Sequence, residues 1–139
     1  MTSERPRVPA THHDLTKAMT ATLSTIGPGG VPQVTAIAFY YDESHGLFHI
    51  SLNDSRQKAR NLRRTPLATL FVMDPENRFR TLEIRADAQL EPDADFSFAA
   101  EAGKKYGHDF HDLDGPGETR SKVTFHPRRI VATDLTPGG

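Results

Sequence analysis

The stretch from residue 82 to residue 90 alternates apolar and polar side chains without a break, reading Leu82-Glu-Ile-Arg-Ala-Asp-Ala-Gln-Leu90. Successive side chains of a β-strand point to opposite faces, so a period of two predicts a strand with one buried and one solvated face. No helix could bury these apolar residues together, because they would be distributed around its axis. A strand of this length therefore makes a predominantly β fold the first expectation.

Turn residues and apolar periodicity divide the rest of the chain into short elements. We expect strands at 21–26, 31–41, 47–52, 67–73 and 122–134, the last interrupted at Pro127, and helices at 12–20, 55–64 and 93–106. Segment 67–73 is continuously apolar, which predicts a strand covered on both sides. In helix 93–106 we expect the inner side to carry Phe96, Ala99, Ala100 and Gly103.

Hairpin signals connect several of these strands. Gly27-Pro-Gly-Gly30 is a turn, so strand 31–41 is expected to pair back on strand 21–26. Antiparallel hairpins and short helices favour a small closed barrel over a doubly wound parallel sheet. We therefore predict an α+β, mainly β domain over residues 12–136, with about six antiparallel strands and a flexible N-terminus at 1–11.

The segment Ser55–Arg64 concentrates positive charge in one short helix. Ser55 is its expected N-cap, and Pro66 ends it by biasing Thr65 away from helical geometry. The segment holds five cations and no acid in a chain whose formal net charge is -1. Free N–H groups at the helix start, with Arg56 and Lys58 beside them, would suit an anion such as a phosphate. A solvated basic surface explains the charge alone equally well.

Composition restricts the class of protein. Leu, Ile, Val and Phe total only 30 of 139 residues, a thin core that predicts further burial between the subunits of a homodimer. The near-neutral charge argues against a nucleic-acid partner, and no apolar run approaches the roughly 20 residues of a membrane span. We therefore expect a cytoplasmic protein. The absence of cysteine excludes disulfides and thiolate chemistry.

No catalytic acid, base or metal site stands out. His108-Asp-Phe-His-Asp-Leu-Asp-Gly115 fails the calcium-loop spacing, and we interpret residues 108–118 as a solvated acidic loop that could cover a substrate pocket. Tyr40 and Tyr41 alternate across a strand, so at most one faces a site, and packing is the expected role of both. His49 and His126 are expected in the core or an interface.

Five fragments, in this order and spacing, resemble the pyridoxamine 5'-phosphate oxidase-like split β-barrels, the flavin and deazaflavin oxidoreductase superfamily. They are Ala21-Thr-Leu-Ser-Thr-Ile26, Gly30-Val-Pro-Gln-Val-Thr35, Ser51 to Pro66, Phe79-Arg-Thr-Leu-Glu-Ile-Arg85 and Val123-Thr-Phe-His-Pro-Arg-Arg-Ile130. The resemblance implies a split barrel that forms a homodimer with two cofactor sites along its interface. Two departures are Ala86, where a glycine is common in the family, and Thr65, where an aspartate is usual.

The resemblance also implies which residues bind the cofactor. Its phosphate would lie on Arg56 and Lys58, with Asn61 nearby. The ring and ribityl chain would be lined by residues of the second and third strands, namely Gln33, Val34, Thr35, Ile50 and Ser51. Phe79, Arg80 and Thr81 occupy the place where the family often supplies a further contact, and Arg80 could instead bind a substrate carboxylate or lie on the surface.

The spacing Arg56-x-Lys58-x-x-Asn61 resembles the branch of the family that uses the deazaflavin coenzyme F420. This implies hydride transfer between the deazaflavin and a conjugated or quinone-like organic substrate, chemistry that the cofactor carries. Two alternatives remain open. One is an oxidase or flavin reductase that binds FMN, for which the phosphate argument is the same. The other is a carrier without turnover, including a haem-binding barrel that uses a histidine.

Overall fold

The computed structural model describes residues 5–138, so residues 1–4 of the predicted flexible N-terminus lie outside the described part. The strands are β1 (Ala21–Ile26), β2 (Pro32–Ile37), β3 (Tyr40–Asp42), β4 (Leu47–Asn53), β5 (Leu67–Asp74), β6 (Asn77–Pro92) and β7 (Arg120–Asp134). The α-helices are α1 (Gln57–Arg64) and α2 (Ser97–Gly103). Short 3₁₀ helices are η1 (Ala10–Lys17), η2 (Pro28–Gly30), η3 (Lys104–Tyr106) and η4 (Phe110–Leu113).

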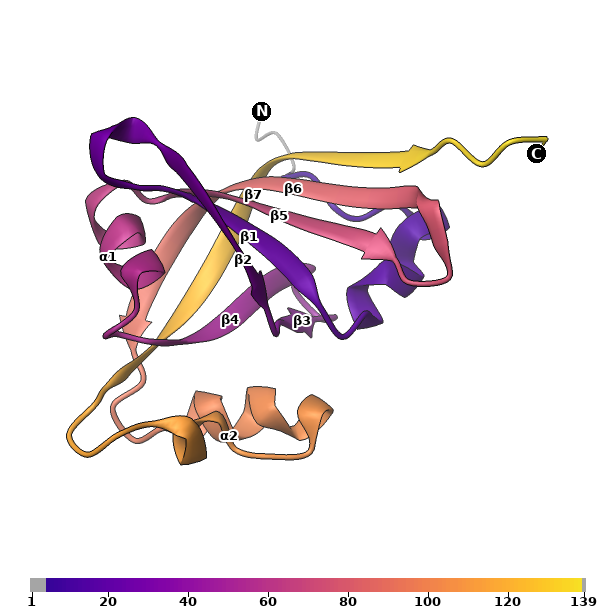
Figure 1. Ribbon diagram of the computed structural model, residues 1–139. Helices are drawn as coiled ribbons and strands as arrows, with labels where there is room; N and C mark the ends of the chain where they lie inside the picture. The colour runs from indigo at the N-terminus through magenta and orange to yellow at the C-terminus, as the bar shows by residue number, and fades with distance from the viewer. Residues whose placement is uncertain (1–4, 139) are drawn as a thin grey trace.

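All seven strands form one antiparallel sheet in the order β2-β1-β5-β6-β7-β4-β3 (Figure 1). The long strands β6 and β7 pair along most of their length and form the centre of the sheet. The sheet curls until β2 and β4 line one pocket, but β2 pairs only with β1. The barrel is therefore split between β2 and β4. The predicted mainly β, antiparallel architecture is confirmed.

The core consists of side chains from the inner face of the curled sheet, joined by Leu15 of η1, Phe39 from the segment between β2 and β3, and Leu62 of α1. Its largest fully buried members are Leu15, Leu23, Phe39, Ile50, Leu62, Leu70, Val72, Leu82, Ile84, Val123 and Phe125. The even positions 82, 84 and 86 of β6 are all buried, as the alternation predicted. Leu62 closes the core from α1, which holds this helix against the sheet by apolar burial.

The segment predicted as one strand over 31–41 is two strands. β2 ends at Ile37, and β3 begins at Tyr40 and pairs with β4 instead of β1. Between them the backbone N–H of Phe39 donates to Tyr106 Oη at 3.0 Å, outside any strand ladder. The run from Val34 to Tyr41 contains no Gly, Pro, Asn or Asp, so no turn residue marks the place where the chain changes partner. This division raises the strand number to seven.

The interruption predicted at Pro127 is a bulge within a continuous strand. Ala86 pairs with Pro127 and Arg85 pairs with Arg129, so Arg128 is an extra residue in β7. Proline lacks the N–H that a regular ladder needs, and a bulge accommodates that loss without ending the strand. Ala86, which stands where a glycine is common in the family, lies at this bulge and is buried.

Three predicted helices have other boundaries. The helix predicted over 12–20 is the 3₁₀ helix η1, which begins at Ala10 and ends at Lys17. Helix α2 covers Ser97–Gly103, because Asp93 accepts the N–H groups of Phe98 and Ala99 and starts the helix late. Its buried residues are Ala99, Ala102 and Gly103. Of the predicted inner residues, Phe96 and Ala100 are only partly buried, and Ala102 was not predicted.

The predicted N-cap of α1 is also wrong. Arg56 occupies the N-cap position, and no side chain caps the helix. Ser55 instead donates its N–H at 2.9 Å and its hydroxyl at 2.7 Å to Asn53 Oδ1. The amide of Asn53 therefore forms the turn that leads into the helix. Lys58 remains within the first turn.

Strand β5 is covered on one side only within this chain. Its buried residues alternate with Leu67, Phe71 and Met73, which are 39%, 38% and 52% exposed. The prediction of cover on both sides is thus wrong for the single chain. The face of the sheet that carries Leu67, Phe71 and Met73 continues over the strands beside β5, and we call it the outer face.

A buried histidine makes the stability of this fold depend on pH. His49 shares a hydrogen bond with Thr124 Oγ1 at 3.0 Å and packs against Tyr40 and Phe98. Burial, followed by the charge of Lys122, lowers the pKa of His49 from 6.5 to about 4.

Because the unfolded chain binds this proton first, the free energy of unfolding is expected to fall as the pH drops from about 6.5 to about 4. One pKa unit corresponds to about 1.4 kcal/mol, so the loss should not exceed about 3 kcal/mol. Urea unfolding at several pH values measures it. His49→Gln should flatten the slope. An equal slope in the His49 variant would contradict the prediction.

Candidate functional site

Helix α1 presents its cations from a short, firmly held element. The helix buries its own residues Ala59, Asn61 and Leu62 against the protein, so its charged residues lie on the outside. Asn61 is fully buried and donates through Nδ2 to Thr25 Oγ1 at 3.0 Å and to Gln33 Oε1 at 2.9 Å. Asn61 therefore ties the helix to the β1–β2 hairpin and orients Gln33.

Three of the five cations have partners in the chain. Arg60 donates to the backbone oxygen of Ser55 and to Gln57 Oε1. Arg63 pairs with Asp54 at 2.5 Å, and Arg64 donates to the backbone oxygen of Ile26 at 3.2 Å. These contacts provide partners for the three positive charges that lie farther from the start of the helix.

Arg56 and Lys58 are different, because these two cations line a pocket and neither meets an acid within residues 5–138. The Arg56 guanidinium has no ion-pair or hydrogen-bond partner there, and Lys58 Nζ donates only to the neutral Thr35 Oγ1 at 3.3 Å. Burial, and secondarily the charge of Arg56, lower the pKa of Lys58. Two adjacent cations, one partly buried, lack a counter-charge in a chain whose net charge is -1. Such a pair attracts an anion.

A pocket of about 170 Å³ lies at the split of the barrel beside these two cations. Its walls come from the end of β2, from β4, from the start of α1 and from the loop before β7. The lining residues are Ala36, Ile37, Ala38, Ile50, Ser51, Leu52, Asn53, Arg56, Lys58, Phe110, Leu113 and Arg120. None of them is an acid, a histidine or a tyrosine, so the pocket walls provide positive charge, hydroxyl and amide groups and apolar surface.

The split also leaves backbone groups free at the pocket. β3 pairs with β4 only from Leu47 to His49, so the same edge of β4 is unpaired from Ile50 to Asn53. Within residues 5–138, the edge of β2 that faces away from β1 is likewise unpaired. Unpaired backbone N–H and C=O groups require partners, and a bound molecule can provide them.

Of the sequence-predicted site residues, the structure brings together Ile50, Ser51, Arg56 and Lys58 in this pocket. Thr35 contacts Lys58, and Gln33 lies against Asn61 under the helix. Val34 pairs with Ser24, which lines a groove of the outer face, so the side chain of Val34 lies on that face.

Phe79, Arg80 and Thr81 lie at the other end of the sheet. Arg80 donates to Asp74 at 2.5 Å and to Asp14 at 2.9 Å, and both contacts raise its pKa. Thr81 pairs with Met73, at the opposite end of β5 from Leu67, which follows α1. The separation along β5 is about 20 Å. The start of β6, which carries these three residues, lies at the far end of the sheet from α1 (Figure 1), so a single chain does not bring them to the pocket.

Sequence reasoning missed Arg120, Phe110 and Leu113 as pocket residues. The loop that holds them was interpreted as a solvated acidic loop, yet the Asp114 side chain is only 1% exposed and pairs with Arg120 at 2.8 Å. Burial would raise the pKa of Asp114, but this ion pair and hydrogen bonds with His111 and Asn53 lower it to about 2. The sequence signal for this ion pair was the short spacing between Asp114 and Arg120, which flank the turn Gly115-Pro-Gly117.

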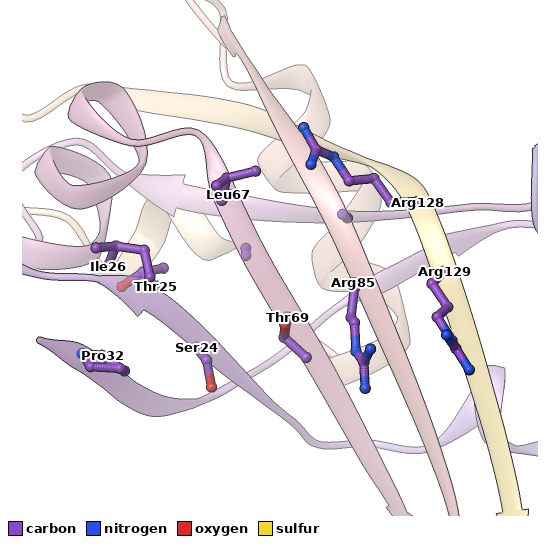
Figure 2. A pocket seen from close by; sticks show the side chains of 11 residues that line it. Ser24, Thr25, Ile26, Pro32, Leu67, Thr69, Arg85, Arg128 and Arg129 are labelled. Atoms are coloured by element: carbon purple, nitrogen blue, oxygen red, sulfur yellow. The ribbon is translucent and has the colours of Figure 1, made fainter. Parts of the chain in front are cut away.

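A second, larger groove of about 470 Å³ crosses the outer face (Figure 2). Cross-strand partners Ser24, Thr69, Arg85 and Arg129 form a row over four strands. In Figure 2, Arg85 and Arg129 run side by side while Arg128 extends the other way. Like charges opposite each other on adjacent strands are unfavourable. Within the described residues Arg85 pairs with Glu83 and Arg128 pairs with Asp87, whereas Arg129 has no acidic partner.

Within residues 5–138, no group of three or more His, Cys, Asp and Glu side chains is placed to hold a metal ion. The described helices are all too short or too polar to cross a membrane.

The fold is that of a split β-barrel with a cationic pocket at the split. Residues 9–134 match the family model described as pyridoxamine 5'-phosphate oxidase. The chain therefore belongs to the pyridoxamine 5'-phosphate oxidase family, which includes oxidoreductases that bind flavins such as FMN.

Three solved structures illustrate the range of similar proteins. An F420 reductase is 26% identical, with a TM-score of 0.74, over 89% of this chain and 98% of the other. A conserved hypothetical protein of Mycobacterium tuberculosis is 23% identical, with a TM-score of 0.73, over 99% and 96%. HutZ, the haem storage protein of Vibrio cholerae, is 18% identical, with a TM-score of 0.71, over 92% and 96%.

Proposed function

We propose that this protein is an oxidoreductase that binds coenzyme F420 and acts on a conjugated or quinone-like organic substrate. The observation that carries the proposal is the pair Arg56 and Lys58, left without an acid at the split of the barrel. The donor set fits a phosphate: a guanidinium, an ammonium and nearby hydroxyl groups can all donate to phosphate oxygens. The similarity to an F420 reductase supports the choice of cofactor.

When bound, the deazaflavin supplies hydride transfer. The chain's own residues bind and orient it. Arg56 and Lys58 hold the phosphate, and Thr35 fixes Lys58 from β2. Ile50, Ser51 and the free backbone edges of β2 and β4 line the continuation of the pocket. Phe110 and Leu113 exclude water from one side. No side chain of the pocket walls is assigned as an acid or base.

We further propose that two copies of the chain complete the site. A pocket of about 170 Å³ is smaller than the roughly 300–1,000 Å³ usual for a whole ligand, so other walls must enclose the rest of the cofactor. The outer face offers exposed apolar residues for the contact. A two-fold axis near the middle of β5 would place Asn77–Thr81 of one copy beside the α1 end of the other. Phe79, Arg80 and Thr81 would then reach the pocket across the interface.

Phe71→Asp tests the dimer. Phe71 lies in the middle of the outer face, and burying an unpaired carboxylate there would be strongly unfavourable. We expect the variant to sediment as a monomer and to bind the cofactor at least about tenfold more weakly. Analytical ultracentrifugation and calorimetry measure both effects. Ala94→Asp, an exposed position before α2, is the matched control. A monomeric wild-type protein, or a dimeric variant, would rule out this interface.

FMN is the alternative cofactor, because its phosphate suits the same cations and the family includes flavin-binding members. A haem carrier is less well supported, because none of the histidines in residues 5–138 lines the pocket. A histidine ligand would have to come from elsewhere. HutZ, at 18% identity, shares the fold alone.

Turnover distinguishes an oxidoreductase from a carrier. Reduced F420 is mixed with the protein and a panel of quinones and enones, and its reoxidation is followed by absorbance. Reoxidation that depends on the protein and on Lys58 supports the proposal. Tight binding without reoxidation by any member of a broad panel would favour the carrier, and turnover with FMN alone would favour the flavin alternative.

A further inference from the structure

Arg120 is a buried cation in the wall of the pocket, and its bonds are specific. It is the first residue of β7 and is 7% exposed. Its Nε donates to both carboxylate oxygens of Asp114, at 3.0 and 2.8 Å, and its Nη2 donates to Oδ1 at 2.8 Å. Its Nη1 donates to Ser51 Oγ at 3.1 Å and to the Ser51 backbone oxygen at 3.3 Å.

These bonds determine what the Ser51 hydroxyl can do. A guanidinium has donors only, so Ser51 Oγ must accept from Arg120. The hydroxyl hydrogen is then directed away from Arg120, and no acceptor for it occurs in the described part of the chain. Ser51 lines the same pocket as Arg56 and Lys58. The free O–H is therefore available to a ligand held by those two cations.

We propose that Arg120 is a positioning residue of this site, which orients the Ser51 hydroxyl to donate a hydrogen bond to an oxygen of the phosphorylated ligand. The proposal rests on the proposed function and deepens it. Asp114 neutralises Arg120, so Arg120 contributes orientation and adds little to the charge that attracts the ligand. The same Asp114 anchors the loop that carries Phe110 and Leu113. One ion pair therefore orients the Ser51 hydroxyl and also holds the apolar wall of the pocket in place.

A double-mutant cycle on the full-length protein tests the proposal. The variants are Ser51→Ala, Arg120→Gln and their combination, and the dissociation constants of F420 and FMN are measured by calorimetry. Ser51→Thr keeps the hydroxyl, and Arg63→Gln removes an acid-paired arginine of the same region that does not line the pocket. Arg120→Gln combined with Asp114→Asn avoids an unpaired buried carboxylate if Arg120→Gln alone does not fold.

We expect Ser51→Ala and Arg120→Gln each to weaken binding about five- to twentyfold, and the combination to be no weaker than either alone. Ser51→Thr, which keeps a hydroxyl for Arg120 to orient, should recover most of the affinity that Ser51→Ala loses, and Arg63→Gln should bind like the wild type. A simple loss of folding would be visible in thermal unfolding and would not produce this coupling.

Unchanged binding in Ser51→Ala, or losses that multiply in the combination, would overturn the role of Arg120. If Lys58→Ala loses affinity while Ser51→Ala does not, this inference fails and the phosphate site stands. If the wild type binds neither cofactor, the proposed function fails and this inference falls with it.

Discussion

Lys58→Ala is expected to weaken F420 binding about 10- to 100-fold. The ammonium is partly buried, has no acidic partner within residues 5–138 and lies beside Arg56. A hydrogen bond between charged groups contributes about 1.5–3 kcal/mol, and each 1.4 kcal/mol changes the dissociation constant about tenfold. The fold should not change, because the Lys58 side chain bonds only to Thr35. Calorimetric titration measures the affinity, and circular dichroism checks the fold.

Arg63→Ala is the matched control for Lys58→Ala, because it removes a positive charge from the same helix. Arg63 is paired with Asp54 and lies outside the pocket, so its loss should change the affinity less than about threefold. Equal losses in both variants would show that the basic helix attracts the cofactor diffusely. No loss in either would show that the helix is only a solvated surface.

Asp114→Ala is expected to lower the free energy of unfolding by about 3–5 kcal/mol. The side chain is 1% exposed and receives hydrogen bonds from Arg120 and Asn53. Its removal leaves the Arg120 guanidinium buried without a counter-charge, which costs far more than the loss of a surface ion pair. Since domains are stable by roughly 5–15 kcal/mol, this change should remove a large part of the total. Urea unfolding at pH 7 measures it.

Asp87→Ala provides the comparison for Asp114→Ala. Asp87 pairs with Arg128 at the same distance of 2.8 Å, but the two side chains are 47% and 62% exposed. An exposed pair of this kind contributes about 0–1 kcal/mol. Similar losses in the two variants would contradict the view that the Asp114–Arg120 pair is buried and anchors the pocket loop.

Much of the fold could be predicted because its signals are local. The alternation at 82–90, the turn at 27–30 and the proline at 66 each act within a few residues, and the elements they predicted are present. The division of residues 31–41 between β2 and β3 could not be predicted, because it depends on a bond from Phe39 to Tyr106, far along the chain. Whether one or both faces of β5 are covered could not be predicted either, because a single chain does not show what lies on its outer face.

The candidate site was predictable to a similar degree. The basic helix and the resemblance both indicated Arg56 and Lys58, but neither revealed that only these two of its five cations line the pocket. That distinction depends on Asp54, on Gln57 and on a carbonyl of β1, which fold against the other three. Arg120 was missed because its burial depends on Asp114, in a loop whose composition is typical of a solvated surface.

Calorimetric titration of the wild-type protein with F420 and, separately, with FMN tests the central claim most directly. The chain contains no tryptophan, so quenching of intrinsic fluorescence would be insensitive. We expect F420 to bind with a dissociation constant of about 1 μM or tighter and FMN to bind more weakly. Binding of neither cofactor would contradict the assignment of Arg56 and Lys58 as a phosphate site.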